Sequence, residues 1–176
     1  SYGGGDSSAV ATSLSAGVSE VFSTGSAFAA LKDDGSVITW GDSYSGGDSS
    51  AVASSLSGGV SQIFSTGGLL FDRGAFAALK DDGSVITWGD SYFGGDSSAV
   101  ASSLSAGVSE VFSTGIAFAA LKDDGSVITW GDSYGGGDSS AVATSLSGGV
   151  SQIFSSGVAF AALKDDGSVI TWGDSY

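Results

Sequence analysis

The sequence predicts an all-β protein built from four tandem copies of a unit that contains a β-hairpin. Three observations predict this class: one phrase recurs four times, a turn signal separates two apolar runs within the phrase, and both faces of the resulting hairpin are apolar. The recurring phrase, AFAALKDDGSVITWGD, places a tryptophan at the same position of each copy, namely Trp40, Trp88, Trp130 and Trp172.

Each copy begins with Ser-Tyr. Cutting the 176 residues at that point gives copies 1–42, 43–90, 91–132 and 133–174, with 175–176 as the start of a further copy. Copy two is six residues longer than the others and carries an insertion near 68–73. Copies one and three share Glu20 and Glu110, whereas copies two and four share Gln62 and Gln152, so pairs of copies were duplicated together. Because the chain stops in the phase in which it starts, we expect it to be a segment of a longer array.

Within the phrase, Asp-Asp-Gly lies between two β-compatible apolar runs, and glycine supplies the positive φ of a tight hairpin turn. Two registers remain open. A two-residue loop sets Ala29 opposite Trp40, whereas a three-residue loop that starts at Asp33 sets Phe28 opposite Trp40. Either register leaves apolar side chains on both faces, so neighbouring sheets must cover both. Stacked sheets in a closed propeller-like ring, or in an open array or filament, provide that cover.

The remainder of each copy supplies a third strand and one ambiguous segment. In copy one, GVSEVFSTG predicts a strand with Val18, Glu20 and Phe22 on one face and Val21 on the other. The segment GGDSSAVATSLSAG fits a short strand or a helical turn equally well. A unit of 42 residues is too small to bury a core of its own, so adjacent copies must cover one another. We expect the repeated aromatic residues to pack between copies: Trp40, Trp88, Trp130, Trp172, Phe28, Phe76, Phe118 and Phe160.

The succession V..VFSTG.AFAALKDDGSVITWGDSY.GGDSSAV resembles the repeats of the regulator-of-chromosome-condensation family. In that family an apolar strand ending in Gly precedes a hairpin of the pattern AL-x-x-DG-x-V-x-x-WG, and the similarity runs through all four copies. The resemblance implies four-stranded blades in a toroid, usually of seven, so four copies are a partial ring, a compact four-bladed ring or part of an open ribbon. No residue matches a motif for the family's nucleotide-exchange or chromatin roles. The copies also look like WGDS-type tandem repeats of microbial surface proteins.

The composition excludes several classes of protein. The chain has no Cys and no His, which removes disulfides, zinc sites with the usual ligands, thiol nucleophiles and Ser-His-Asp chemistry. Five basic residues against 19 acidic ones give a net charge of −14, which repels nucleic acid and anionic lipid. No stretch approaches the roughly 18 apolar residues that span a bilayer. We therefore expect no enzyme activity, no cofactor, no nucleic-acid partner and no membrane insertion.

Three features are candidate binding sites. The Asp-Asp-Gly turns offer oxygen ligands to calcium, but they lack the spaced acids of calcium loops, which favours the turn interpretation. Trp40 with Tyr44, and their equivalents, suit platforms for sugar rings, although packing in a core is the stronger interpretation. The insertion and one other departure from the repeat give a candidate contact patch for a partner: Leu69, Leu70, Phe71, Arg73 and Phe93.

Together these features predict a non-catalytic structural scaffold, a fragment of a longer extracellular or cell-surface array that self-assembles into a fibre. Its expected partners are neighbouring repeats or further copies of the same chain. The alternatives are a carbohydrate-binding propeller that holds glycans in its aromatic loops, and an adhesin stiffened by calcium.

Overall fold

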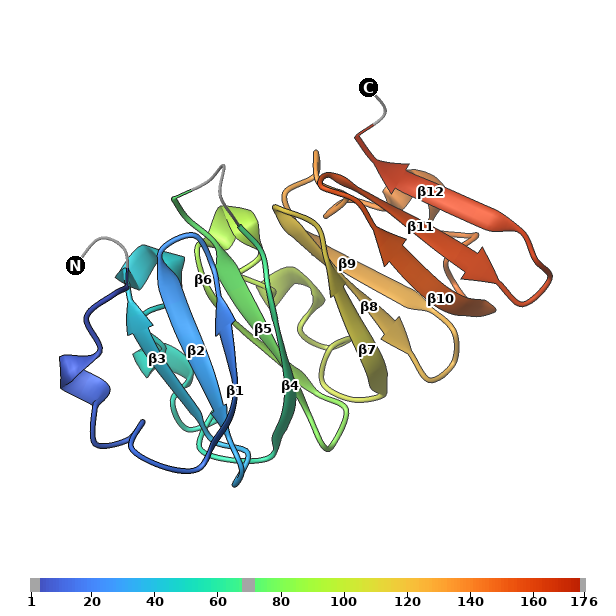
Figure 1. The fold of residues 1–176 in the computed structure, drawn as a ribbon. Coiled ribbons are helices and arrows are strands. Elements are labelled where there is room, and N and C mark those ends of the chain that lie inside the picture. The colour runs from blue at the N-terminus through green and yellow to red at the C-terminus, as the bar shows by residue number, and fades with distance from the viewer. Residues whose placement is uncertain (1–3, 68–71, 175–176) are drawn as a thin grey trace.

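The computed structural model describes residues 4–67 and 72–174, which form four three-stranded antiparallel sheets that lie side by side in chain order (Figure 1). Each sheet comes from one copy and keeps its strands in sequence order. We number these sheets blades 1 to 4. The first and last blades lie at opposite ends of the row, so the sheets form an open array. The all-β repeat class predicted from the sequence is confirmed.

Every described blade has two six-residue strands followed by one of five residues. In chain order the strands are β1 (Val18–Ser23), β2 (Ala27–Lys32), β3 (Val37–Gly41), β4 (Val60–Ser65), β5 (Ala75–Lys80), β6 (Val85–Gly89), β7 (Val108–Ser113), β8 (Ala117–Lys122), β9 (Val127–Gly131), β10 (Val150–Ser155), β11 (Ala159–Lys164) and β12 (Val169–Gly173). The helices are three-residue 3-10 turns: η1 (Ser8–Val10), η2 (Ser43–Ser45), η3 (Ser50–Val52), η4 (Ser91–Phe93), η5 (Ser98–Val100) and η6 (Ser140–Val142). No helix in the described ranges is long and apolar enough to cross a membrane.

The segment that the sequence leaves open between strand and helical turn forms a 3-10 turn in every copy. In copy one, Asp6 fixes the start of this turn, because its Oδ1 accepts the N–H of Ser8 at 3.0 Å. The backbone bonds of the turn are local, so the segment adds no strand to a sheet. The four-stranded blade implied by the family resemblance is therefore wrong for the described chain, in which every blade has three strands.

The hairpin adopts the longer of the two predicted loops. In blade 1 the Lys32 N–H donates to the Ser36 carbonyl at 2.9 Å, which leaves three residues in the turn. Phe28 consequently pairs with Trp40. The last turn residue is a glycine at φ +75°, a value that glycine adopts without strain. Asp34 braces the turn, since its Oδ1 accepts the N–H and the hydroxyl of Ser36 at 3.0 and 2.6 Å.

The first strand of each blade contains a β-bulge that the simple alternation of side chains does not reveal. In blade 2 the pairing with β5 shifts between Val60 and Gln62, so Ser61 is the extra residue. An extra residue reverses the alternation beyond it. Val60 and Ile63 therefore point into one buried cluster, whereas Phe64 packs against the cluster on the other side of the sheet. The predicted alternation, which puts the equivalents of Val60 and Phe64 on one face, is wrong for this reason.

Three buried apolar clusters form the core of the described residues, and each lies between two successive blades. We name them junctions 1–2, 2–3 and 3–4. One blade contributes small and aliphatic side chains, and the next contributes a phenylalanine and a tryptophan together with a leucine from its connecting segment. Junction 1–2 contains Ala27, Ala29, Leu31, Val37, Leu56, Val60, Ile63, Phe76, Ala78 and Trp88.

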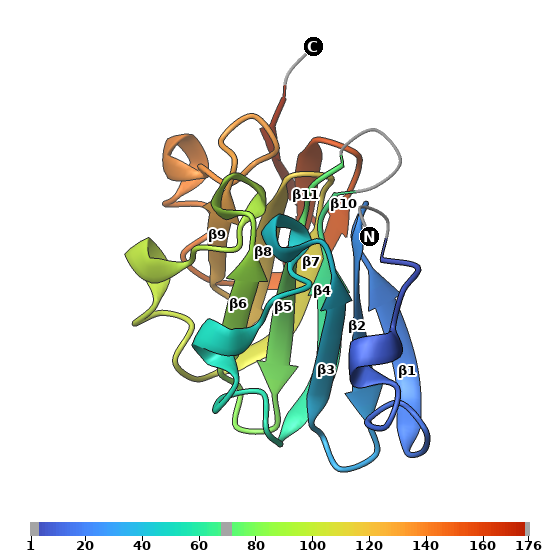
Figure 2. The same cartoon turned by 90° about the vertical axis from the view of Figure 1, so that its left-hand side faces the viewer.

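A side view shows how the strands are ordered across each blade (Figure 2). The first strands, β1, β4, β7 and β10, are neighbours along one side of the array. The turns η2 to η5 lie beside the third strands β6 and β9 on the other side. The connecting segment of copy two also reaches back to blade 1, because the Leu56 carbonyl accepts the N–H of Val37 at 2.9 Å. Backbone hydrogen bonds as well as apolar contacts therefore tie consecutive copies together.

Candidate interaction surfaces

Of the four tryptophans, Trp88, Trp130 and Trp172 lie in the junctions, whereas Trp40 lies on the face of blade 1 that no described blade covers, so its predicted packing between copies is wrong for the described chain. Each tryptophan stacks on the phenylalanine that pairs with it, with ring centroids 5.2–5.3 Å apart and interplanar angles of 16–24°. In blades 2 to 4 the indole N–H also donates to a glycine carbonyl of the connecting segment, as Trp88 does to Gly46 at 3.0 Å. These three indoles are buried, so they offer no face to a sugar ring.

The exposed aromatic residues are instead the tyrosines of the connecting segments. Tyr92 and Tyr134 lie on the surface, each more than half exposed. A hydrogen bond with Asp132 raises the pKa of Tyr92, and a hydrogen bond with Asp174 raises the pKa of Tyr134. Each of these tyrosines is therefore held by the aspartate that follows the tryptophan of its own copy.

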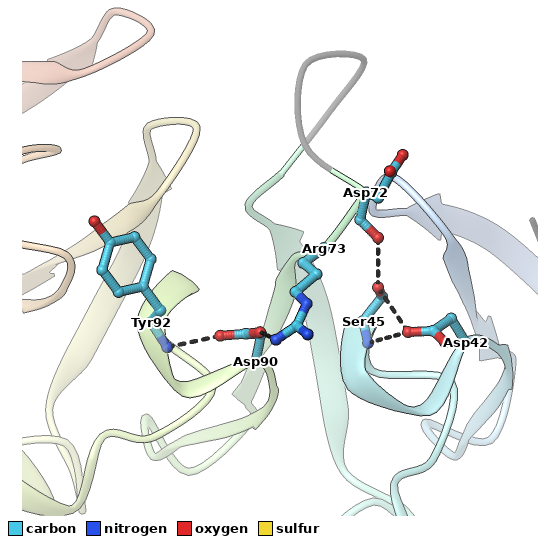
Figure 3. Close-up of polar contacts among 6 residues, drawn as sticks. All are labelled: Asp42, Ser45, Asp72, Arg73, Asp90 and Tyr92. Carbon is cyan, nitrogen blue, oxygen red and sulfur yellow. Dashed lines mark hydrogen bonds and ion pairs between the residues drawn. The ribbon is translucent and has the colours of Figure 1, made fainter. Parts of the chain in front are cut away.

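Copy two places the single arginine of the chain at this contact (Figure 3). Arg73 comes from the insertion and lies between Tyr44 and Asp90, the equivalents of Tyr92 and Asp132. Its guanidinium forms an ion pair with Asp90 at 2.8 Å and lies over the Tyr44 ring, 5.3 Å from the centroid. The hydrogen bond and the charge of Asp90 raise the pKa of Arg73, so the guanidinium stays charged.

A second departure from the repeat lies beside this arginine. Ser45 is fully buried, and its hydroxyl contacts both the Asp72 carbonyl at 3.0 Å and Asp42 Oδ1 at 3.2 Å (Figure 3). The other copies have glycine or phenylalanine at this position. The serine is thus specific to the copy with the insertion, and it anchors the end of the insertion to the connecting segment.

These side chains line an open hollow of about 440 Å³, formed by Ser26, Asp42, Tyr44, Asp72 and Arg73. The carboxylates accept hydrogen bonds, the guanidinium donates them, and the exposed ring of Tyr44 adds an apolar contact. The hollow therefore has the donors and acceptors of a site for a polar ligand. Arg73, however, already lies over one face of the tyrosine ring.

The structure separates the residues of the predicted contact patch. Leu69, Leu70 and Phe71 lie outside the described residues. Arg73 lies at the hollow. Phe93 lies in junction 2–3 and is 7% exposed, so it belongs to the core between two copies and not to an open docking surface.

The Asp-Asp-Gly turns hold their second carboxylates with serine donors. In blade 2 the hydroxyl and the N–H of Ser84 donate to Asp82, and these two bonds lower the pKa of Asp82. The same cause lowers the pKa of the equivalent residues Asp34, Asp124 and Asp166. No group of three or more acidic side chains placed to hold a metal ion occurs within 4–67 and 72–174.

Exposed apolar side chains gather at the two ends of the array. Apart from three tyrosines, the exposed large apolar residues of the described chain are Val21 in blade 1 and Phe154 and Val169 in blade 4. These residues belong to the two blade faces that have no neighbouring blade. We define the head face as Leu14, Val18, Val21, Phe28 and Trp40, and the tail face as Phe154, Ala159, Ala161, Leu163 and Val169.

Sequence reasoning identifies Arg73 but not the residues that surround it. The sequence does show that Ser45 and the insertion, which both differ from the other copies, occur in the same copy. The head and tail faces are not singled out either, although the first and last copies of any open array each lack one neighbour.

The fold is similar to that of known propeller proteins, although no family model and no curated protein matches the sequence. Human WBSCR16 is 20% identical, with a TM-score of 0.53 over 89% of this chain and 47% of that chain. The ectodomain of the Physcomitrella patens receptor kinase CR4 is 16% identical, with a TM-score of 0.52 over 90% and 39% of the two chains. Yeast RCC1 (Prp20), solved bound to Kap60, is 16% identical, with a TM-score of 0.52 over 89% and 43%.

The chain thus spans less than half the length of each of these three proteins. Identities this low establish the fold alone. The described residues have an RCC1-like propeller fold, present here as an open row of four blades.

Proposed function

We propose that this chain is a non-catalytic repeat scaffold that binds protein surfaces and serves as a segment of a longer extracellular or cell-surface array. One observation carries the proposal: all three buried clusters of the described residues lie between blades. In such an array each blade is stabilised chiefly by its neighbours. The interaction on which this scaffold depends is therefore the packing of one sheet against the next.

Self-assembly into a fibre belongs to this proposal. The apolar side chains at both ends of the row support it, since contiguous exposed apolar surface is typical of interaction sites. The net charge of −14 limits nonspecific association between chains. The likeness of the copies to WGDS-type repeats of microbial surface proteins supports an extracellular position.

The similar structures support a protein-binding role. Yeast RCC1 (Prp20) was solved bound to Kap60, and a second structure of Prp20p was reported with its binding properties to Gsp1p and histones. Those individual partners are not transferred, because this chain covers less than half of that protein. We carry over only the use of the fold to bind other proteins.

Electron microscopy of the purified chain over a range of concentrations tests the self-assembling scaffold. We expect particles that contain more than one chain and that grow in number or length as the concentration rises. Dispersed particles of the size of one chain at every concentration would reject self-assembly, while leaving the stacked-blade architecture in place.

A second candidate function is binding of a carbohydrate in the hollow around Arg73. The exposed Tyr44 ring beside carboxylate and guanidinium groups favours it. A glycan array with the wild-type chain and the Tyr44→Ala variant tests this function, with Tyr92→Ala as the matched control at a tyrosine that has no arginine beside it. We expect binding that Tyr44→Ala abolishes and Tyr92→Ala retains. A wild-type chain that binds no glycan would exclude this function.

A further inference from the structure

We propose that the tail face of one copy binds the head face of a second copy of this chain, forming a fourth junction of the same kind as the three within the chain. This inference rests on the proposed scaffold function, in the form in which separate chains are the segments of the longer array, and deepens it by naming the partner and the surface. The two faces lie at opposite ends of the row (Figure 1), so one copy does not bring its own head and tail together.

The apolar side chains of the two faces match the two halves of junction 2–3. The tail face, in the order given above, corresponds to the residues that blade 2 contributes: Phe64, Ala75, Ala77, Leu79 and Val85. The head face corresponds to the residues that copy three contributes: Leu104, Val108, Val111, Phe118 and Trp130. Every pair in these two sets has the same residue type, whereas Phe93 and Ile116, which also lie in junction 2–3, correspond to Gly3 and Ser26 in copy one. Five residues from each half of a junction are therefore present at the two ends of the chain.

The alternation of the copies points to the same partner. Copies two and four carry Gln and Ile in the first strand, whereas copies one and three carry Glu and Val. Placing blade 1 of a second chain after blade 4 continues this alternation. The new contact then joins the same two kinds of copy as junction 2–3, with smaller side chains at the positions that Phe93 and Ile116 occupy there.

Backbone groups fix the register of the contact. In junction 2–3 the Val85 N–H donates to the Leu104 carbonyl at 2.9 Å, and the Val108 N–H donates to the Gly83 carbonyl at 3.0 Å. The end faces carry the four matching groups: the Val169 N–H and Gly167 carbonyl at the tail, and the Leu14 carbonyl and Val18 N–H at the head. The two bonds run in opposite directions between the chains, so a single alignment satisfies both.

The space for the second copy is open at the tail. A Cβ added at Gly83 would lie 2.9 Å from the backbone nitrogen of Gly107 in the next copy. At Gly167, the equivalent glycine of blade 4, a Cβ would meet nothing within 4 Å. The position that the following copy fills inside the chain is thus accessible at its end.

Charge opposes the contact, because each chain carries a net charge of −14. Salt shortens the range of this repulsion from about 10 Å at 0.1 M to about 3 Å at 1 M. We therefore expect the association to strengthen as salt is added. Head and tail faces differ, so the contact builds a closed ring when the rotation between copies closes and a filament when it does not.

Sedimentation equilibrium of the full chain in 1 M NaCl tests the proposal with three variants. Val169→Asp changes the tail face, Val21→Asp changes the head face, and Ser102→Asp adds the same charge at an exposed residue that is in neither face. We expect the wild type and Ser102→Asp to associate, and each face variant to associate about 100-fold more weakly or worse, since docking would bury an unpaired carboxylate. An equimolar mixture of the two face variants should associate again, because it contains one intact head and one intact tail.

A wild-type chain that stays monomeric at all concentrations in 1 M NaCl overturns the proposal, as does association that neither face variant weakens. Thermal unfolding of the same samples separates this failure from failure of the scaffold function. If the wild type is monomeric but unfolds cooperatively, only the docking proposal fails, because the internal junctions are still formed. Val169 and Val21 are already exposed, so we expect both variants to fold, and each tests the contact independently if the other does not.

Discussion

Val127 and Val169 occupy the same position in successive copies, yet Val127 is 8% exposed and Val169 is 58% exposed. Within their own sheets the two valines have the same partner, since Val127 pairs with Leu121 and Val169 pairs with Leu163. The difference lies in the copy that follows. Leu146 and its neighbours cover Val127, whereas no described residue of a following copy covers Val169. Burial in this molecule is thus a property of the junction between two blades and not of a blade alone.

The largest expected effect comes from placing a charge at equivalent positions of a junction and of an end. Val111 is 1% exposed in junction 2–3, whereas its equivalent Val21 is 53% exposed at the head. We predict that Val111→Asp lowers the free energy of unfolding by about 3–5 kcal/mol, because it buries a carboxylate without a partner. Val21→Asp should change it by less than about 1 kcal/mol. Urea unfolding followed by circular dichroism, at a concentration that keeps the chain monomeric, measures both, and equal losses would refute the comparison.

The turn glycines separate backbone strain from contact with the next copy. Gly125 and Gly167 both have positive φ, at +75° and +82°, so alanine strains the backbone at either position. A Cβ at Gly125 would also lie 2.8 Å from the Gly149 nitrogen, whereas at Gly167 it would meet nothing within 4 Å. We predict a loss of about 1–2 kcal/mol for Gly167→Ala and a further 1–3 kcal/mol or so for Gly125→Ala. The difference in urea midpoints measures the contact alone, and its absence would show that the turn does not depend on the next copy.

Acid stability should not distinguish the junctions from the tail, because its cause lies within each turn. Hydrogen bonds from serine lower the pKa of Asp124 and of Asp166 below the ordinary value of 3.8. A pKa that is lower in the folded chain stabilises it above pH 3.8, and this stabilisation is lost as the pH falls through the folded-state pKa. Below pH 3.8 the melting temperature of the wild type should therefore fall. The Ser126→Ala and Ser168→Ala variants should each show a smaller fall than the wild type, and the two reductions should be similar. Melting curves between pH 2 and 7 test this, and an effect confined to Ser126→Ala would contradict it.

The smallest expected effect concerns the arginine of copy two. Arg73 is largely exposed, so Arg73→Ala should change the free energy of unfolding by less than about 1 kcal/mol. Its removal frees Asp90 to bond Tyr44, as Asp132 bonds Tyr92 in copy three. A thermal melt combined with a crystal structure of the variant checks both outcomes. A loss of several kcal/mol would mean that the insertion is essential to junction 1–2.

Most of the fold follows from patterns that act within one copy. The Asp-Asp-Gly turn predicts the hairpin, and the apolar residues on both of its faces predict stacked sheets. Sequence leaves the register open because it does not show that Ser36 binds Asp34 and thereby fixes a three-residue turn. The bulge at Ser61 and its equivalents escapes prediction because alternation is read as if no residue were extra.

The candidate sites depend on contacts between residues far apart in the chain, and sequence predicts them less well. The insertion marks Arg73 as individual, but its position over Tyr44 depends on how the connecting segment returns to the blade. Phe93 is individual in the sequence too, yet it fills space inside junction 2–3. The head and tail faces consist of residues identical to those of the core, so only the place of a copy in the row makes them a surface.

The dependence of each blade on its neighbours is tested most directly with copy three alone, residues 91–132, in dilute buffer. Near-ultraviolet circular dichroism and urea unfolding, with sedimentation to establish that the segment is monomeric, report whether Phe118 and Trp130 keep their fixed packing. We predict that the monomeric segment shows neither a near-ultraviolet signal nor a cooperative transition, because it lacks both of its junctions. A monomeric segment that unfolds cooperatively would contradict this dependence.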